Sequence, residues 1–314
     1  MKTMRELSSI AAISVLCITP AIAQEPPASP PKVCQLGRVA SIDLKTGAEG
    51  MVFLDGTVDG QRGDFLVDTG GAGLLLSYEA AYRLGATPMR SFMSGAFIGG
   101  TTLDYGVAAK RLQIGNMTTT APWFLLAPSH MFPSDAMGNV QPHALWPPYD
   151  IEIDFRAGKL NLFQTNQCRG HVVYWTHKPY AAVPMTINPD GHIAVQTILD
   201  GKPVSALLDT GSQNSLISLR AASHILDIDE TTKDVTSLGA VMINGEVKAQ
   251  RYRFPFKTLT FEGISISNPK IEIADTGNDS RKDPLLLGIG VLRQLHLFIA
   301  YDESMLYLTG AEDE

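Results

Sequence analysis

Residues 57–77 read TVDGQRGDFLVDTGGAGLLLS, and residues 198–218 read ILDGKPVSALLDTGSQNSLIS. The two stretches align without a gap, and 8 of the 21 aligned positions are identical. The identical pairs are Asp59/Asp200, Gly60/Gly201, Leu66/Leu207, Asp68/Asp209, Thr69/Thr210, Gly70/Gly211, Leu75/Leu216 and Ser77/Ser218. In each copy an Asp-Gly turn joins two short β-prone runs, which is the pattern of a β-hairpin. The repeat therefore predicts a chain built from two similar halves.

The ends of the two halves also echo each other. Ile151–Phe163 and Leu297–Leu308 both alternate in the way expected of a β-hairpin. Short strands, frequent Gly and Asn turns and few helical periods predict an all-β fold. We expect an N-terminal lobe over residues 45–168 and a C-terminal lobe over residues 169–314.

The triplet Asp-Thr-Gly occurs three times, in two kinds of context. The copy at Asp275–Gly277 is followed by a polar loop, and we interpret it as an ordinary turn. Asp68 and Asp209 instead each follow an apolar run, which predicts a partly buried carboxylate at the end of a strand. These two aspartates are therefore the candidate catalytic residues.

The residues around this pair suit acid–base chemistry. The hydroxyl groups of Thr69 and Thr210 can hydrogen-bond neighbouring backbone, while Gly70 and Gly211 allow backbone to approach a carboxylate closely. Two such loops that meet across a pseudo-twofold axis would place the carboxylates together. The pair would then share one proton, so that one member acts as base and the other as acid. A water activated in this way can attack a peptide carbonyl without a metal, cofactor or covalent intermediate.

Two apolar residues, Asp-Thr-Gly, an apolar run and Ser make a pattern that resembles the pepsin and retropepsin superfamily. Among these proteins, the chain is most similar to bacterial exported aspartyl proteases with two retropepsin-like halves, over roughly residues 45–310. Leu285–Arg293 also resembles the family's apolar-apolar-Gly strand and helix behind the catalytic loop. The resemblance implies two pseudo-twofold-related, retropepsin-like (acid protease) β-barrel lobes and aspartic endopeptidase activity. It further implies that Gly-rich segments form flaps over the substrate, and the candidate flap residues are Gly95, Gly99, Gly100, Gly239 and Gly245.

The first half departs from this pattern at two places. Residues 135–148 read DAMGNVQPHALWPP where the apolar-apolar-Gly strand and helix should stand, so we expect that element to be missing or much altered. Gly71 follows the first triplet, whereas Ser212 follows the second and could hydrogen-bond the pair through its side chain. These departures keep an alternative open, a catalytically silent module that holds an extended peptide by strand addition.

The N-terminus predicts export. A short positive region precedes the apolar run Ile10–Ile18 and the small-x-small pattern Ala21–Ala23, as in a cleaved signal peptide over residues 1–23. The alternative is a membrane anchor, but the run is shorter than the roughly 20 residues that cross a bilayer. A Pro-rich leader follows over residues 24–44. We therefore expect a secreted or periplasmic protein.

The cysteines, the net charge and the histidine spacing limit the disulfides, ligands and partners that we expect. Removal of the signal peptide leaves Cys34 and Cys168, which we expect to form a disulfide; two unpaired buried thiols are the alternative. The net charge of -7 and the lack of a basic cluster disfavour the binding of nucleic acids and anionic membranes. No later stretch is long enough for a transmembrane helix, so no stable membrane insertion is expected. The seven histidines lack metal-ligand spacing, so no metal is expected. The expected molecule is a monomer with an internal pseudo-dimer, and its partner is a peptide or unfolded protein substrate.

Overall fold

The computed structural model describes residues 34–71, 73–96, 102–133, 136–189, 191–243, 246–275 and 284–311. They belong to one compact unit, Cys34–Glu314. The expected signal peptide, residues 1–23, lies outside the described residues, as does most of the expected leader. The strand β1 begins at Arg38, within the span expected as leader.

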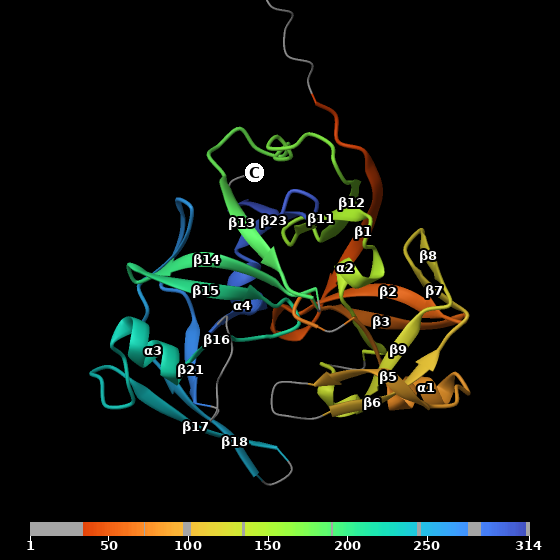
Figure 1. The fold of residues 1–314 in the computed structure, drawn as a ribbon, viewed down its shortest axis with the longest axis horizontal. Helices are drawn as coiled ribbons and strands as arrows, with labels where there is room; N and C mark the ends of the chain where they lie inside the picture. Colours follow the sequence, from red (N-terminus) through yellow and green to blue (C-terminus); the bar gives the residue numbers. More distant parts are fainter. Residues whose placement is uncertain are drawn as a thin grey trace, which may run out of the picture. The chain divides into compact units, whose positions relative to one another are not determined.

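A six-stranded antiparallel sheet joins the two halves of the chain. Its order is β1 (Arg38–Thr46), β12 (Lys159–Gln164), β11 (Tyr149–Asp154), β23 (Leu295–Ala300), β24 (Met305–Gly310) and β13 (Ala181–Ile187). The central pair takes β11 from the first half and β23 from the second, with Ile151 opposite Ile299. In Figure 1 these strands lie at the top of the view, where they join the two lobes. We call this sheet the interlobe sheet.

The first lobe is built on one further sheet. Its strands are β2 (Val52–Val58), β3 (Gln61–Val67), β4 (Leu74–Ser77), β5 (Met89–Ala96), β6 (Thr102–Ala108), β7 (Arg111–Ile114), β8 (Met117–Thr120), β9 (Trp123–Ala127) and β10 (Gly138–Val140). Its helices are η1 (Ala48–Gly50), α1 (Tyr78–Arg83), η2 (Ser129–Met131) and α2 (Pro142–Leu145). The strands pair in the order β8-β7-β2-β3-β10-β4-β9-β6-β5.

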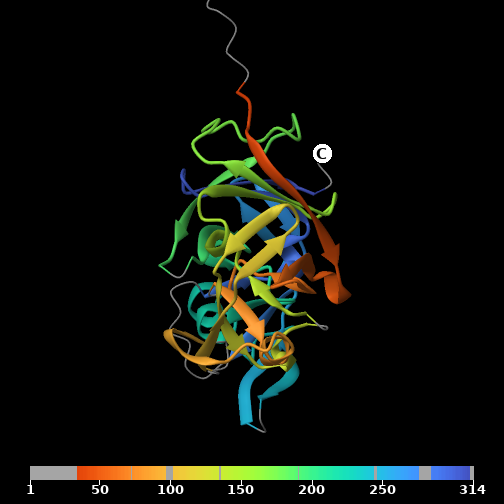
Figure 2. The same ribbon diagram turned by 90° about the vertical axis from the view of Figure 1, so that its right-hand side faces the viewer.

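The second lobe repeats this sheet strand for strand. Its strands are β14 (Ile193–Leu199), β15 (Lys202–Leu208), β16 (Ser215–Ser218), β17 (Thr236–Ile243), β18 (Glu246–Arg253), β19 (Thr258–Phe261), β20 (Ile264–Ser267), β21 (Ile271–Asp275) and β22 (Leu285–Leu287). Its helices are α3 (Leu219–Leu226) and α4 (Ile289–Leu292). The order β20-β19-β14-β15-β22-β16-β21-β18-β17 matches the first lobe position by position. Figure 2 shows the first lobe from its own side, with its yellow strands in front. The all-β, two-lobed fold predicted from the repeat is confirmed.

The two Asp-Gly dipeptides form matching hairpin turns. Asp59 and Gly60 have φ of 48° and 86°, and Asp200 and Gly201 have φ of 46° and 82°. Positive φ at both central residues suits the twist of the flanking strands and favours Asp-Gly. Each aspartate also holds the next part of its sheet, because Oδ1 of Asp59 accepts from the backbone N–H of Arg111 at 2.8 Å, and Oδ1 of Asp200 accepts from Thr258 at 2.8 Å. Both turns therefore fix the strands β3 and β15 that lead to the triplets.

The serines that end both repeats begin a helix. Ser77 accepts a hydrogen bond from the N–H of Ala80 at 3.0 Å, and Ser218 accepts from Ala221 at 3.2 Å. A side-chain oxygen at this position pairs one of the unsatisfied N–H groups of the first turn. The helices α1 and α3 thus start at equivalent places after β4 and β16.

Residues 136–148 form the strand and helix that the sequence led us to expect missing or much altered. The strand β10 pairs in parallel with β3 and antiparallel with β4, as β22 does with β15 and β16. The helix α2 follows β10, as α4 follows β22. The strand and helix are therefore present, and only their sequence differs. For example, Asn139 occupies the position that Leu286 has in the second half.

The expected disulfide joins Cys34 to Cys168, with 5.4 Å between the Cα atoms. It ties the segment before β1 to the segment after β12. Within the described ranges, no helix combines the length and the apolar character that a membrane span requires.

The interlobe sheet carries two buried acidic residues away from the triplets. Burial raises the pKa of Asp150 to about 6, although the N–H of Tyr301 donates to its Oδ1 at 2.9 Å. Glu152 is fully buried and lies 2.9 Å from the Nε2 atom of His296, while Nδ2 of Asn161 donates to Glu152 at 2.5 Å. These groups lie at the junction of the halves and outside the candidate site.

Candidate active site

Each triplet aspartate follows the strand that its hairpin fixes. Asp68 comes directly after β3, and Asp209 comes directly after β15. The N–H of Asp68 donates to the carbonyl oxygen of Val140 at 3.0 Å, and the N–H of Asp209 donates to Leu287 at 2.9 Å. The ends of β10 and β22 therefore hold the two aspartates in equivalent positions.

The two threonines lock the triplets to each other across the halves. The Oγ1 atom of Thr69 accepts from the N–H of Thr210 at 3.1 Å, and Oγ1 of Thr210 accepts from the N–H of Thr69 at 3.1 Å. Each hydroxyl also donates to the other half, Thr69 to the carbonyl of Leu208 at 2.8 Å and Thr210 to that of Val67 at 2.7 Å. These four reciprocal hydrogen bonds are buried and fix the relative position of the two loops.

The two glycines permit the close approach of the carboxyl groups. A Cβ atom added at Gly70 would lie 2.4 Å from Cγ of Asp209, and one added at Gly211 would lie 2.3 Å from Oδ1 of Asp68. Real Cβ atoms do not approach other atoms this closely, so any side chain at either position would displace the opposite carboxyl group. Glycine is required because the two carboxyl groups meet above the opposite loops.

The environment of Asp68 and Asp209 favours the retention of one proton by the pair. Asp68 is 9% exposed and Asp209 is 8% exposed, and burial raises the pKa of both. The negative charge of Asp68 raises the pKa of Asp209 further, and the hydrogen bond between the carboxyl groups raises that of Asp209 while lowering that of Asp68. Two neighbouring carboxyl groups resist double ionisation, so the pair can retain one proton where isolated aspartates would both be ionised.

Two residues act on Asp68 that the sequence did not single out. The Nδ2 atom of Asn139 donates to Oδ2 of Asp68, and the positive form of His192 lowers the pKa of Asp68. An alignment of residues 138–140 with 285–287 would have set Asn139 against Leu286. No spacing in the sequence points to His192, because it precedes β14 and approaches Asp68 through the tertiary fold.

The serine after the second triplet is turned away from the pair. The Ser212 hydroxyl donates to the carbonyl oxygen of Asn214 at 3.0 Å, and its backbone N–H is the group that acts on Asp209. Gly71, at the equivalent position of the first half, borders Asp68 and Asn139. The two halves thus surround their aspartates differently.

The two candidate flap residues in the described ranges, Gly95 and Gly239, lie in equivalent hairpins. Gly95 lies in β5, which pairs with β6, and Gly239 lies in β17, which pairs with β18. Gly239 has φ of 87° beside a register shift, a conformation that favours glycine. Gly99, Gly100 and Gly245 lie outside the described residues.

The third triplet is separate from the pair. Asp275 is the last residue of β21, opposite Gln250 of β18. The two following residues, Thr276 and Gly277, lie outside the described residues. Asp275 therefore lies on a strand that pairs with the β17–β18 hairpin, and not on the strand β15 that leads to Asp209.

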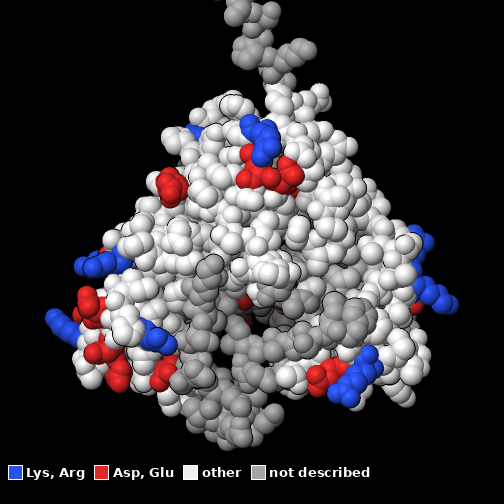
Figure 3. Space-filling model, in the orientation of Figure 1, with Lys and Arg blue, Asp and Glu red and all other residues white. Residues whose placement is uncertain are grey.

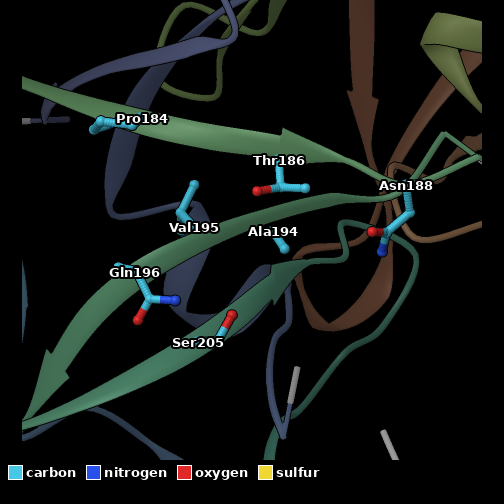
Figure 4. A pocket seen from close by; sticks show the side chains of 7 residues that line it. All are labelled: Pro184, Thr186, Asn188, Ala194, Val195, Gln196 and Ser205. Atoms are coloured by element: carbon cyan, nitrogen blue, oxygen red, sulfur yellow. The ribbon is translucent and has the colours of Figure 1, made fainter. Parts of the chain in front are cut away.

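One face of the molecule is hollowed near its centre (Figure 3). In Figure 3, acidic atoms are visible at the bottom of a hollow near the centre of this face, while the other charged side chains in view lie nearer its edge. A separate pocket of about 130 Å³ lies on β13, β14 and β15 (Figure 4). It is lined by Pro184, Thr186, Asn188, Ala194, Val195, Gln196 and Ser205. None of these side chains is ionisable, so this pocket offers no acid–base group for hydrolysis.

Comparison with known proteins agrees with this arrangement. A model of a family described as aspartyl protease matches residues 54–142 and 195–291, which together make more than half of the chain. An aspartic proteinase from Irpex lacteus has a similar structure, with a TM-score of 0.53 and 13% identity, over 87% of this chain and 98% of that one. Basic 7S globulin from soybean has a TM-score of 0.50 and 11% identity, over 88% of this chain and 97% of that one. No curated protein matches the sequence significantly. One matched segment contains Asp68 and the other contains Asp209.

Proposed function

Because the chain belongs to the aspartyl protease family, we propose that it is an aspartic endopeptidase whose catalytic pair is Asp68 and Asp209. The observation that carries the proposal is the meeting of two buried carboxyl groups, each packed over the glycine of the opposite triplet. The reciprocal threonine bonds support it, since catalysis needs the two groups held in one geometry.

In the proposed mechanism the pair carries one proton. Asp68 is the ionised member and takes a proton from a water, which attacks the carbonyl carbon of the peptide. Asp209 donates its proton to the carbonyl oxygen as the tetrahedral intermediate forms. Collapse of the intermediate breaks the C–N bond as Asp68 passes its proton to the leaving amine, and Asp209 takes a proton back from a hydroxyl of the gem-diol, which restores the pair with one proton. The hydrogen bond that the Asn139 amide donates to Oδ2 of Asp68 supports this division of roles, because a donated hydrogen bond favours the ionised form of a carboxyl group.

The proposed substrate is a peptide or unfolded protein in an extended conformation. The hairpins β5–β6 and β17–β18 are the proposed flaps, and their equivalent places in the two lobes support that role. We further propose that residues 1–23 are a signal peptide and that the protein acts in the periplasm or outside the cell as a monomer. The disulfide Cys34–Cys168 supports an oxidising compartment.

Substitution of each aspartate tests the proposal. Asp68→Asn and Asp209→Asn should each lower kcat/KM on a peptide library by about a thousandfold, within the range of lost acid–base catalysis. Asp275→Asn is the matched control, because it changes the same residue of an identical triplet outside the pair. The proposal is wrong if both pair variants cleave the library as fast as the wild type while remaining folded by circular dichroism.

The alternative is a silent peptide-binding module with the same fold. The fold by itself does not distinguish the two functions, because Basic 7S globulin from soybean shares it. This module would bind an extended peptide and release it uncut. Turnover that a pepstatin-like inhibitor blocks, and that both pair variants lose, would eliminate it.

A further inference from the structure

We propose that Asn139 is a positioning residue that keeps Asp68 ionised, and that residue 71 is a glycine because the Asn139 amide needs the space beside Asp68. The inference rests on the proposed peptidase function. It concerns how two aspartates in duplicated loops come to have different hydrogen-bond donors.

The position of Asn139 in the fold is one that normally takes an apolar residue. Asn139 is the middle residue of β10, between Leu66 of β3 and Leu75 of β4, and is 2% exposed. The equivalent residue of the second half is Leu286, between Leu207 and Leu216. A buried amide costs free energy unless it is hydrogen-bonded. At Asn139 the bond is the one from Nδ2 to Oδ2 of Asp68, and Oδ1 finds no donor among the described residues.

The chemistry of this contact favours one protonation state. The amide nitrogen of Asn139 can donate a hydrogen bond but cannot accept one. It therefore stabilises the carboxylate form of Asp68 relative to the acid. The described donors to Asp209 are the backbone N–H groups of Gly211 and Ser212. Only Asp68 thus receives a side-chain amide in the described part of the chain, and this asymmetry separates the roles of two otherwise duplicated aspartates.

Gly71 is explained by space rather than by backbone conformation. Its φ lies outside the positive region that favours glycine. A Cβ atom at this position would lie 2.5 Å from Oδ2 of Asp68 and 3.2 Å from Nδ2 of Asn139. A side chain at residue 71 and the Asn139 amide would therefore compete for the same carboxylate oxygen.

Two other ionisable groups act on Asp68 from the elements packed around it. Asp209 shares the proton, and His192, which precedes β14, lowers the pKa of Asp68 when it is positive. Neither β10 nor β4 brings an ionisable side chain to Asp68 in the described structure. Both groups remain in every variant below, so their effects form a constant background.

Asn139→Leu tests the role of the amide, with the side chain of the second half as the replacement. Loss of a hydrogen bond to a charged group should raise the acid limb of the kcat/KM profile by about 1 pH unit. Asn161→Leu is the matched control, because Asn161 is also a buried amide that donates to a carboxylate, that of Glu152, and its Oδ1 is likewise unpartnered among the described residues. The control should lose stability without moving the acid limb.

A swap tests the link to Gly71. Gly71→Ser alone should lower kcat/KM about tenfold or more, because its Cβ would displace Asp68 and Asn139 from their positions. Combined with Asn139→Ala, the new hydroxyl has room to donate to Asp68, so the acid limb should return part of the way to the wild-type value. A double variant whose acid limb stays where Asn139→Ala alone puts it would overturn the link.

A measurement that needs no turnover separates this inference from the proposed function. ¹³C NMR of aspartate carboxyl carbons, with Asp68→Asn as the assignment reference, should show a higher Asp68 titration midpoint in Asn139→Leu than in the wild type. If Asn139→Leu does not fold, Asn139→Ala serves the same purpose. A shifted midpoint without peptidase activity would refute the function and leave the positioning role intact. An unchanged or lowered midpoint in an active enzyme would overturn the positioning role.

Discussion

The reciprocal hydrogen bonds of Thr69 and Thr210 give the sharpest test of how the two halves hold the candidate pair. Thr69→Val keeps the shape of the side chain and removes only its hydroxyl. The substitution breaks the bond from the hydroxyl to the carbonyl of Leu208, at 2.8 Å, and the bond that it accepts from the N–H of Thr210, at 3.1 Å. Both lie in the buried contact between the halves.

The cost follows from what each broken bond leaves behind. A buried N–H without an acceptor costs about 1–3 kcal/mol, and the lost bond to a carbonyl costs about 0.5–1.5 kcal/mol. We therefore expect Thr69→Val to lower the free energy of unfolding by about 2–4 kcal/mol. A domain of ordinary stability, about 5–15 kcal/mol, would still fold. Because the loops then hold the aspartates less firmly, kcat/KM should fall as well.

Urea unfolding followed by circular dichroism measures this cost, and two variants calibrate it. Thr197→Val removes a hydroxyl that is equally buried but makes one described hydrogen bond, to the carbonyl of Val204 at 2.8 Å, so it should cost about 1 kcal/mol. Thr69→Ser keeps the hydroxyl and should retain most of the activity. If Thr69→Val lowers the free energy of unfolding no more than Thr197→Val does, the reciprocal threonine hydrogen bonds do not hold the two halves together.

Three further predictions concern other parts of the molecule. The native state binds a proton at Asp150 up to about pH 6, whereas the unfolded chain releases it near pH 4, so ionising Asp150 lowers stability as the pH rises through this window. Between about pH 4 and pH 7.5, the free energy of unfolding measured in urea should therefore fall by about 2–3 kcal/mol less in Asp150→Asn than in the wild type. An equal fall in both proteins would show that the ionisation of Asp150 does not cause it. Gly138→Ala should unfold or prevent expression of the folded protein, because its Cβ would lie 2.0 Å from the carbonyl oxygen of Leu75; a wild-type melting temperature would exclude this contact. Reduction of the disulfide between Cys34 and Cys168, or the double serine variant, should lower the free energy of unfolding by about 2–5 kcal/mol, and an unchanged urea midpoint would show that the bond contributes nothing.

Local sequence patterns predicted most of the fold and identified Asp68 and Asp209 as the candidate pair. The turns at Asp59-Gly60 and Asp200-Gly201 require positive φ, and few residue pairs other than Asp-Gly adopt it readily. The same reasoning applies to the serines that begin α1 and α3, since each cap forms within three residues of chain. Such features depend on neighbours in the sequence, so a duplicated sequence alone determined a duplicated all-β fold and the equivalence of its two triplets.

Only the tertiary structure decided what surrounds the pair. The strand β10 is three residues long, Gly138–Val140, and its identity as a strand comes from its partners β3 and β4. Local propensity cannot specify so short an element when packing determines it. The approach of Asn139 to Asp68 and the space left at Gly71 are likewise contacts between residues far apart in the chain. The sequence by itself determined that two equivalent aspartates exist, whereas the packing of β10 decided that they have different neighbours, because burial and hydrogen bonding depend on what the whole fold brings together.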